Sequence, residues 1–350
     1  MNNSIKQNHI VYWLFFNAFM IICMVFIGGV TRLTDSGLSM IDWNLFKGII
    51  PPTNDQDWEV LFNKYKKFPE YKVINFNISL DDFKQIFFWE YFHRIWGRLI
   101  GLTFLVPFIY YLLKKSFTKN ARLFLYLILA LGCFQGFMGW YMVQSGLVDK
   151  PDVSQYRLAA HLSIAFILYT SILFLAWNIY RSQKINYLTR LPSFKNAVNR
   201  TRLCFILTFL TAIFGAFVAG TNAGLAYNNF PYMGESILPP DAFILEPAWK
   251  NMFENVSLIQ FNHRLLASIT TIVIIVCSYL NYKYIKDIVI KRLSIILGFS
   301  IFIQYCLGII TLKLLVPIAL GAIHQLGSLF VLTILTLMLS EFYSKKKGEI

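Results

Sequence analysis

The chain has 350 residues, of which 57% are apolar, 17% aromatic and only 14% charged. A soluble protein of this size carries about a quarter charged residues, so the composition excludes an ordinary soluble domain and favours a membrane protein. The formal net charge of +14 does not indicate a nucleic-acid partner, because the basic residues are concentrated in alternate connections between apolar segments.

Eight apolar segments follow one another along the chain, each about as long as the roughly 20 residues that cross a bilayer as a helix. The expected fold is therefore an all-α polytopic protein, surrounded by membrane lipid, with eight transmembrane helices. The predicted spans are residues 10–30, 87–113, 123–143, 158–180, 203–220, 257–282, 293–312 and 317–341.

The longest connection, residues 31–85, separates the first two spans. It contains Pro51, Pro52 and Pro69 together with several acidic residues. We expect it to form a small ordered cap outside the membrane, and not a ninth span.

Basic residues are unevenly distributed among the connections. If the N-terminus lies inside, the inner segments hold 18 Lys and Arg and the outer connections hold 11, seven of them in the acidic connection 31–85. This asymmetry predicts an N-in, C-in topology. Neither a cleavable signal nor an Arg-rich presequence is visible, which favours a bacterial cytoplasmic (inner) membrane.

An internal repeat divides the chain. The stretch "GGVTRLTDSGLS", from Gly28, matches "GAFVAGTNAGLA", from Gly215. Further matches keep the same order: His93 with His263, Gln135-x-x-x-Gly139 with Gln304-x-x-x-Gly308, and His161 with His324. We therefore predict two parallel four-helix-bundle repeats, an N-terminal half at 1–190 and a C-terminal half at 191–350.

Four histidines occupy matched places in the two halves: His93, His161, His263 and His324. Each lies four to seven residues into an even-numbered span, roughly 6–10 Å below the outer surface in the predicted topology. Ionisable residues at such depth are costly and usually functional, although hydrogen-bonded packing is the structural alternative. Two imidazoles at equal depth suit axial ligation of one heme iron, so each half offers one heme-like site. Zinc is disfavoured, because the cysteines, at positions 23, 133, 204, 277 and 306, all fall within spans and supply no nearby thiolate.

Arginines accompany these histidines. Arg94 and Arg264 follow two of them directly, Arg98 lies one turn deeper, and Arg157 lies one turn above His161. Guanidinium groups are well suited to hold carboxylates, so we expect these residues to bind heme propionates. Snorkelling to the membrane interface is the alternative.

One acidic residue breaks the symmetry of the repeat. Glu90 precedes His93 by three residues on the same helix face, whereas its counterpart at an offset of 170 is Gln260. A carboxylate beside a porphyrin takes up a proton or stabilises developing positive charge, which a pure electron carrier does not need. The asymmetry predicts that the N-terminal half reacts and the C-terminal half relays electrons. The alternative is an interfacial Glu90, or one that simply pairs with Arg94.

The chain resembles the heme A synthase family over almost its whole length. The resemblance is carried by "GGVTRLTDSGLSMIDW", "EYFHRIWGRLIG", "FQGFMGWYMVQSGL", "SQYRLAAHL", "AGTNAGLAYNNFPYMGES", "QFNHRLLA" and "HQLGSL". It is similar to the subfamily shared by proteobacteria and mitochondria. Another bacterial branch has a cysteine pair in its first outer loop, and this chain has none there, so a role for that pair does not carry over.

The resemblance implies an activity, the oxidation of a methyl group of heme O to the formyl group of heme A through successive hydroxylations and loss of water. It implies a heme b cofactor on His263 and His324. It also implies that His93 and His161 face the substrate heme, with Glu90 as the catalytic acid. The implied partners are heme O synthase upstream, heme-copper terminal oxidases that receive the product, and an unidentified electron acceptor.

Two other functions fit parts of the pattern. A diheme b-type cytochrome would carry electrons through both sites without any heme chemistry, and Glu90 would then be incidental. A transporter also commonly contains parallel repeats, but it needs a polar site at mid-membrane, where this chain is almost entirely apolar.

Overall fold

The computed structural model describes residues 3–40, 48–146, 152–182 and 192–346. Eight helices are long and apolar enough to cross a membrane, and the described residues contain no β-strand, which confirms the expected all-helical fold with eight spans. The eight are α1 (Asn3–Leu33), α4 (Leu80–Leu113), α5 (Lys119–Gln144), α6 (Gln155–Ser182), α7 (Pro192–Gly220), α9 (Val256–Tyr284), α10 (Ile288–Lys313) and α11 (Ile318–Lys346).

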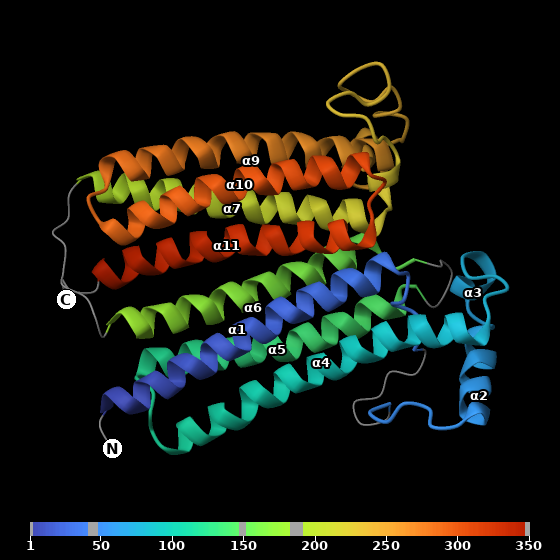
Figure 1. Ribbon diagram of the computed structural model, residues 1–350, viewed down its shortest axis with the longest axis horizontal. Helices are drawn as coiled ribbons and strands as arrows, with labels where there is room; N and C mark the ends of the chain where they lie inside the picture. Colours follow the sequence, from blue (N-terminus) through green and yellow to red (C-terminus); the bar gives the residue numbers. More distant parts are fainter. Residues whose placement is uncertain (1–2, 41–47, 147–151, 183–191, 347–350) are drawn as a thin grey trace.

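The spanning helices form two groups of four with corresponding neighbours. In the N-terminal bundle, α1 packs against α4 and α6, and α5 packs against α6. In the C-terminal bundle, α7 packs against α9 and α11, and α10 packs against α9 and α11. Helices α4 and α6 therefore stand opposite each other, as do α9 and α11. Both chain ends lie at one end of the bundles and the long connections at the other (Figure 1).

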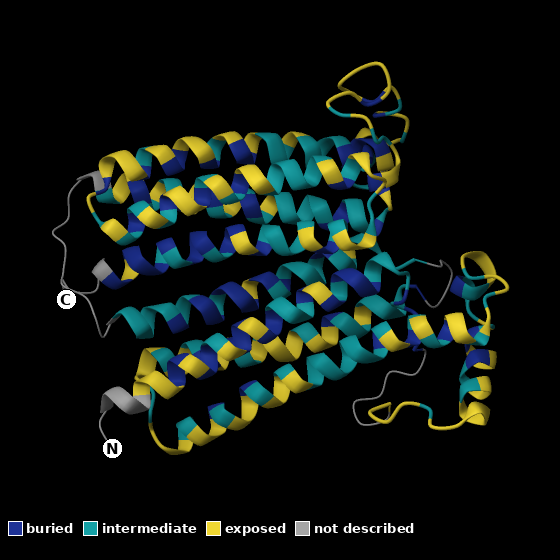
Figure 2. Cartoon of the chain, in the orientation of Figure 1, coloured by how far each residue is buried: buried dark blue, intermediate teal, exposed yellow. Residues whose placement is uncertain are grey.

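Helices α1, α6, α7 and α11 join the two bundles. The contacts run between α6 and α11, α6 and α7, and α1 and α11. The largest cluster of buried side chains extends from this boundary through the N-terminal bundle and includes Leu14, Tyr169 and Leu332. The buried positions follow these central helices, whereas many positions of the outer helices are exposed (Figure 2). An exposed apolar surface of this extent suits contact with lipid.

The two bundles differ in how tightly their outer helices pack. Helices α9 and α10 lie against each other along much of their length, whereas α4 and α5 make few contacts. Helix α4 also contains Pro107, which removes a backbone hydrogen bond within the helix. The N-terminal bundle is therefore more open on its α4–α5 side.

The connection before α4 contains two short helices, α2 (Asp55–Tyr65) and α3 (Pro69–Val73), and no ninth span. They pack through an aromatic cluster onto the first turns of α4, which extend beyond the predicted span to Leu80. A reciprocal pair of hydrogen bonds between Ser79 and Asp82 begins α4. Residues 41–47 of this connection lie outside the described part of the chain.

The matching connection before α9 is more compact. It contains the short helices η1 (Ala223–Leu225), η2 (Ala248–Lys250) and α8 (Asn251–Glu254). Asp241 accepts hydrogen bonds from Ser257 Oγ (2.6 Å) and Tyr227 Oη (3.0 Å). The bond from Ser257 is the main reason why the pKa of Asp241 lies below its usual value. These contacts fasten the connection to the start of α9.

Candidate functional site

The four spanning histidines lie on opposite helices of the two bundles. His93 is on α4 and His161 on α6, while His263 is on α9 and His324 on α11. His161, His263 and His324 stand six or seven residues after the first residue of their helices, at the end that bears the long connections. Each bundle thus brings two imidazoles together from opposite sides.

The two imidazoles of the C-terminal bundle have the separation of a bis-histidine metal site. The ring centroids of His263 and His324 are 6.5 Å apart, and their planes are nearly perpendicular at 89°. Two metal–nitrogen bonds of about 2.0–2.1 Å would place the centroids of two ligating imidazoles about 6 Å apart. The separation of the described pair therefore matches that of two imidazoles that ligate a single heme iron.

Neighbouring groups hold the Nδ1 atoms of this pair. His263 Nδ1 lies 3.2 Å from the carbonyl oxygen of Thr211, and His324 Nδ1 lies 3.2 Å from Gln304 Nε2. A proton on Nδ1 of His263, donated to Thr211, leaves the lone pair on Nε2. The carbonyl of Thr211 thus orients His263 Nε2 towards a metal. Gln304 Nε2 is a donor, and its shorter hydrogen bond goes to the backbone carbonyl of His324 at 2.8 Å.

The N-terminal pair has a different environment. The Nδ1 atoms of His93 and His161 have no hydrogen-bond partner among the described residues. Gln135 Nε2 lies 3.2 Å from His161 Nε2. The imidazoles of this pair are therefore less firmly held by protein groups than those of the C-terminal bundle.

A glycine on a neighbouring helix lies against each histidine ring. A Cβ atom added at any of these glycines would come within 2.8 to 3.2 Å of a histidine Cε1 atom. Such a contact is too close for a larger side chain without displacement of the ring. The pairs are Gly28 with His93, Gly139 with His161, Gly215 with His263, and Gly308 with His324.

Glu90 is buried beside the N-terminal pair and accepts three hydrogen bonds. Its Oε2 atom accepts from Ser39 Oγ and from the backbone N–H of Met40, both at 2.7 Å. Its Oε1 atom accepts from Arg94 Nη2 at 2.5 Å, and the same Nη2 donates to the Met40 carbonyl at 2.7 Å. A carboxylate only accepts hydrogen bonds, and here both of its oxygens are engaged.

At the corresponding place in the C-terminal bundle, the side chain donates a hydrogen bond to the connection instead of accepting one. Gln260 Nε2 donates to the carbonyl of Tyr227 at 2.9 Å, and Arg264 Nη2 donates to the same carbonyl at 2.6 Å. The arginine thus binds a loop carbonyl in both bundles, Met40 in one and Tyr227 in the other. An acid is present in only one of them.

The predicted arginines all lie near the histidine pairs, but several donate to protein groups. Arg94 binds Glu90 and Met40, and Arg264 Nη1 also donates to the carbonyl of Asn229 at 2.9 Å. Arg157 Nη1 donates to the carbonyl of Tyr141 at 2.6 Å, with the guanidinium 3.7 Å from the centroid of that ring. Arg98 lies half-buried one turn below Arg94. Binding of propionates by these residues stays a prediction.

Helix α5 has open space beside its histidine-facing side. Gly132 and Gly136 precede Gly139 by seven and three residues, so they share its face of the helix. A Cβ atom added at either glycine would meet no other atom within 4 Å. Gly139 corresponds to Gly308 of α10 at an offset of 169, and at the same offset Gly132 and Gly136 correspond to Ile301 and Tyr305. Ile301 is buried, and the ring of Tyr305 contacts Phe230, so these side chains fill the space on α10.

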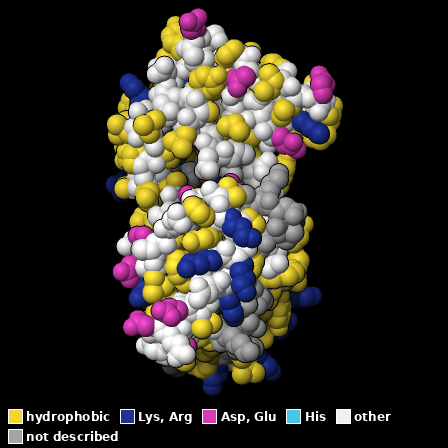
Figure 3. Space-filling model, turned by 90° about the vertical axis from the view of Figure 1, so that its right-hand side faces the viewer, with side chains coloured by type: hydrophobic (Ala, Val, Ile, Leu, Met, Phe, Trp, Pro, Cys, Tyr) yellow, Lys and Arg dark blue, Asp and Glu magenta, His cyan; other side chains and the backbone are white. Residues whose placement is uncertain are grey.

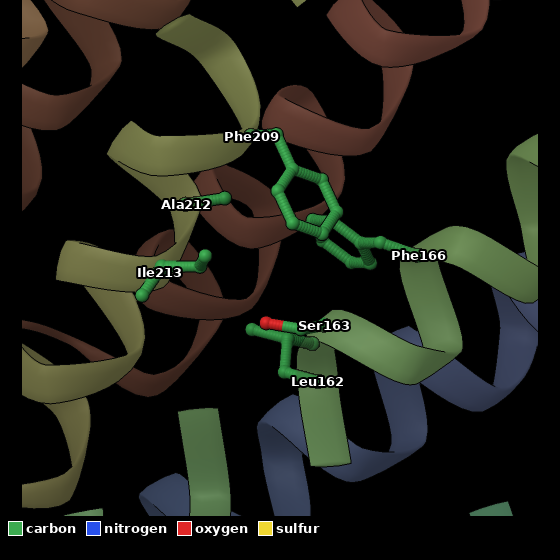
Figure 4. Close-up of a pocket in the computed structure, with 6 residues that line it drawn as sticks. All are labelled: Leu162, Ser163, Phe166, Phe209, Ala212 and Ile213. Carbon is green, nitrogen blue, oxygen red and sulfur yellow. The ribbon is translucent and has the colours of Figure 1, made fainter. Parts of the chain in front are cut away.

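A narrow, mostly apolar gap lies between α6 and α7 at the boundary of the two bundles. Leu162 and Ser163 of α6 face Ala212 and Ile213 of α7 across a gap too small for a water molecule, which Phe166 and Phe209 close (Figure 4). Leu162 follows His161 directly, and Ala212 follows Thr211, the residue that contacts His263. Residues next to His161 and next to Thr211 thus line the same narrow gap between α6 and α7.

The end that bears the long connections carries charged side chains among exposed apolar ones (Figure 3). Figure 3 shows acidic and basic side chains dispersed over this face, with a group of Lys and Arg side chains over the N-terminal half. Inside the cap, Glu70 is buried and accepts a hydrogen bond from Tyr65 Oη at 2.9 Å. Burial raises the pKa of Glu70 to about 8.

The sequence did not predict a role for Ser39, Thr211, Gln135 or Gln304. The last two were visible as part of the repeat, in the matching Gln-x-x-x-Gly patterns, but nothing in the pattern showed that their amides contact histidines. Ser39 lies near the beginning of a connection, and Thr211 acts through its backbone carbonyl. Spacing along a helix therefore did not indicate either residue.

Comparison with known proteins gives a consistent result. A family model described as "cytochrome oxidase assembly protein" matches residues 11–336. A heme A synthase of Nitrosospira multiformis is 44% identical over 93% of this chain and 91% of its own length. The heme A synthases of Bos taurus and Homo sapiens are 43% and 42% identical, over 91% and 88% of this chain and 78% and 76% of their own lengths.

Proposed function

The chain belongs to the cytochrome oxidase assembly protein family, and we propose how its two bundles divide the work of a heme A synthase. Its relatives in bacteria and mammals, similar over most of the chain, are heme A synthases. The protein is accordingly a multi-pass membrane oxidoreductase that acts on heme O and serves the assembly of cytochrome oxidase.

The N-terminal bundle binds heme O between His93 and His161, and the C-terminal bundle binds a heme b cofactor between His263 and His324. The observation that carries this assignment is the difference between Glu90 and Gln260 at corresponding places. An enzyme that oxidises one heme and keeps another needs an acid–base group at the first and not at the second. The contact of His263 Nδ1 with the Thr211 carbonyl also suits a permanent ligand.

Glu90 serves the reaction as a carboxylate. Oxidation of a methyl group to an aldehyde releases protons, and a carboxylate beside the reacting carbon takes them up or stabilises positive charge that develops there. Arg94 holds Glu90 in place by a charge-assisted hydrogen bond. Arg98 and Arg157 bind the propionates of the substrate, and Arg264 those of the cofactor.

The heme b cofactor supplies one-electron redox chemistry when it is bound. His263 and His324 hold it, with the fit given by their 6.5 Å centroid separation. Phe166 of α6 and Phe209 of α7 line the boundary between the two bundles, and a heme b held by His263 and His324 would supply one-electron chemistry on the C-terminal side of that boundary.

The open face of α5 supports the choice of substrate half. Heme O carries a long isoprenoid side chain that heme b lacks, and this chain needs an apolar space beside the porphyrin. Gly132 and Gly136 leave such a space where α10 has Ile301 and Tyr305. The few contacts between α4 and α5 place the same space next to the lipid from which an apolar substrate arrives.

The protein works in a bacterial cytoplasmic (inner) membrane with N-in, C-in topology and both heme sites towards the outer face. The charge of the connections supports this orientation. Heme O synthase supplies the substrate, and heme-copper terminal oxidases receive the product.

The heme content of membranes that lack this protein tests the activity. Loss of heme A with retention of heme O is the expected result, and return of the gene restores heme A. Membranes that lose a b-type cytochrome signal but keep heme A would instead favour a diheme electron carrier.

A further inference from the structure

The asymmetry at Glu90 extends to the residue that holds it. Ser39 is 3% exposed, and its hydroxyl donates to Glu90 Oε2 at 2.7 Å. At the offset of 187 that relates Gly28 to Gly215, its counterpart in the C-terminal bundle is Ala226. Ala226 has no hydroxyl to donate, and the nearby Gln260 instead donates to the backbone. The half with the acid Glu90 therefore has a serine at this position, and the half with the amide Gln260 has an alanine.

Ser39 lies on a short stretch that is itself firmly held. The backbone N–H of Ser36 donates to Thr31 at 3.0 Å, and the hydroxyls of Thr34 and Ser36 share a hydrogen bond of 2.7 Å. The next residue, Met40, is fixed from both sides, because its N–H donates to Glu90 and its carbonyl accepts from Arg94. This stretch therefore holds the Ser39 hydroxyl in a fixed position, from which it donates to Glu90 Oε2.

We propose that Ser39 is a positioning residue for the reaction, one that sets the orientation of the Glu90 carboxylate towards the substrate. The assignment rests on the proposed catalytic role of Glu90. Arg94 donates to Oε1. Ser39 and the Met40 amide both donate to Oε2, so hydrogen bonds at both oxygens fix the plane of the carboxylate. Without the hydroxyl, one oxygen keeps a single backbone donor and the carboxylate rotates more freely about its last bond.

The test compares Ser39→Ala with a matched control, Ser36→Ala. Ser36 is fully buried in the same stretch, but its hydroxyl contacts Thr34 and not Glu90. A hydrogen bond to a charged group contributes enough that its loss is expected to lower kcat for heme A formation about 10-fold in Ser39→Ala. In Ser39→Ala we expect the KM for heme O and the content of bound heme b to stay unchanged. Ser36→Ala should behave as wild type. Ser39→Thr keeps a hydroxyl and should restore most of kcat.

Glu90→Gln, assayed in parallel, separates the two levels of the hypothesis. If Glu90→Gln forms heme A normally, the proposed catalytic role fails and the role of Ser39 fails with it. If Glu90→Gln is inactive while Ser39→Ala keeps the wild-type kcat, only the positioning role is wrong. An equal loss in Ser36→Ala and Ser39→Ala, or loss of heme b in Ser39→Ala, would show a general structural effect and would also overturn it.

Discussion

Glu90 and Gln260 stand at corresponding places in the two bundles, yet they make opposite hydrogen bonds to the adjoining connection. Glu90 accepts from the N–H of Met40, whereas Gln260 donates to the carbonyl of Tyr227. The connection therefore donates hydrogen bonds to an acid in the N-terminal half, and it accepts one from an amide in the C-terminal half. This difference is the strongest structural reason to expect different chemistry from two otherwise similar histidine pairs.

Substitution of His263 or His324 by alanine is expected to remove the tightly held heme b, because each imidazole supplies one of two axial bonds. Visible spectra and heme stoichiometry of the purified variants measure this. His9→Ala, at an exposed position of α1, is the control and should keep the heme. Unchanged heme b in both variants would refute the ligand assignment.

Filling the open face of α5 is expected to impair use of heme O. Gly136→Leu places a side chain where none is now present, and we expect heme A formation to fall roughly 10-fold or more while heme b stays bound. Leu123→Phe adds bulk on the opposite face of the same helix, at a residue that is 62% exposed, and should have little effect. Normal activity of Gly136→Leu would mean that the isoprenoid chain lies elsewhere.

The orientation in the membrane is tested by cysteine labelling from each side. Cysteine at Ile237, in the connection before α9, should react with an impermeant reagent from the outer side. Cysteine at Ile288, where α10 begins, should react only from the cytoplasmic side. The reverse pattern would place both heme sites at the inner face.

The cap is expected to lose stability as the pH rises. Burial raises the pKa of Glu70 to about 8 in the folded cap, above the ordinary value of 4.5 expected for the unfolded chain. The protonated form is therefore favoured by folding, and its contribution is fully present below about pH 4.5 and lost as the pH rises through about 8. Fluorescence of Trp58, which packs against Phe83 and Phe87, reports this change.

Glu70→Gln should weaken that dependence on pH, since it stays neutral throughout. Glu59→Gln, at an exposed position of α2, should leave it intact. Equal pH profiles for Glu70→Gln and wild type would exclude Glu70 as the source.

The sequence was sufficient to predict the eight spans, and it singled out the histidines and Glu90 as candidates for the sites. Length and hydropathy alone define a helix in a bilayer, and ionisable side chains such as His263 and Glu90 are conspicuous in an apolar segment. The repeat then indicated which histidines belong to one bundle, and the structure places His263 opposite His324.

Contacts made by connections could not be predicted in this way. Ser39 contacts Glu90 across 51 residues of sequence, and no helical period relates the two. The sequence left the pairing of Arg94 with Glu90 open as an alternative, and the structure contains that hydrogen bond. The additional donation from Arg94 to the Met40 carbonyl could not be predicted, because a guanidinium next to a histidine suits a propionate equally well. The open face at Gly132 and Gly136 became apparent only when α5 and α10 were compared in three dimensions.

The central claim is that the N-terminal bundle reacts and the C-terminal bundle holds the cofactor, and heme extraction from Glu90→Gln tests it most directly. Chromatography of the hemes should show that Glu90→Gln keeps heme b and loses most heme A, with a slowing of about 10²–10⁴-fold as for loss of other acid–base groups, while Gln260→Glu still forms heme A. Accumulation of a hydroxymethyl heme in Glu90→Gln would strengthen this result. Normal heme A formation by Glu90→Gln, or loss of heme b along with heme A, would contradict the division of roles between the two bundles.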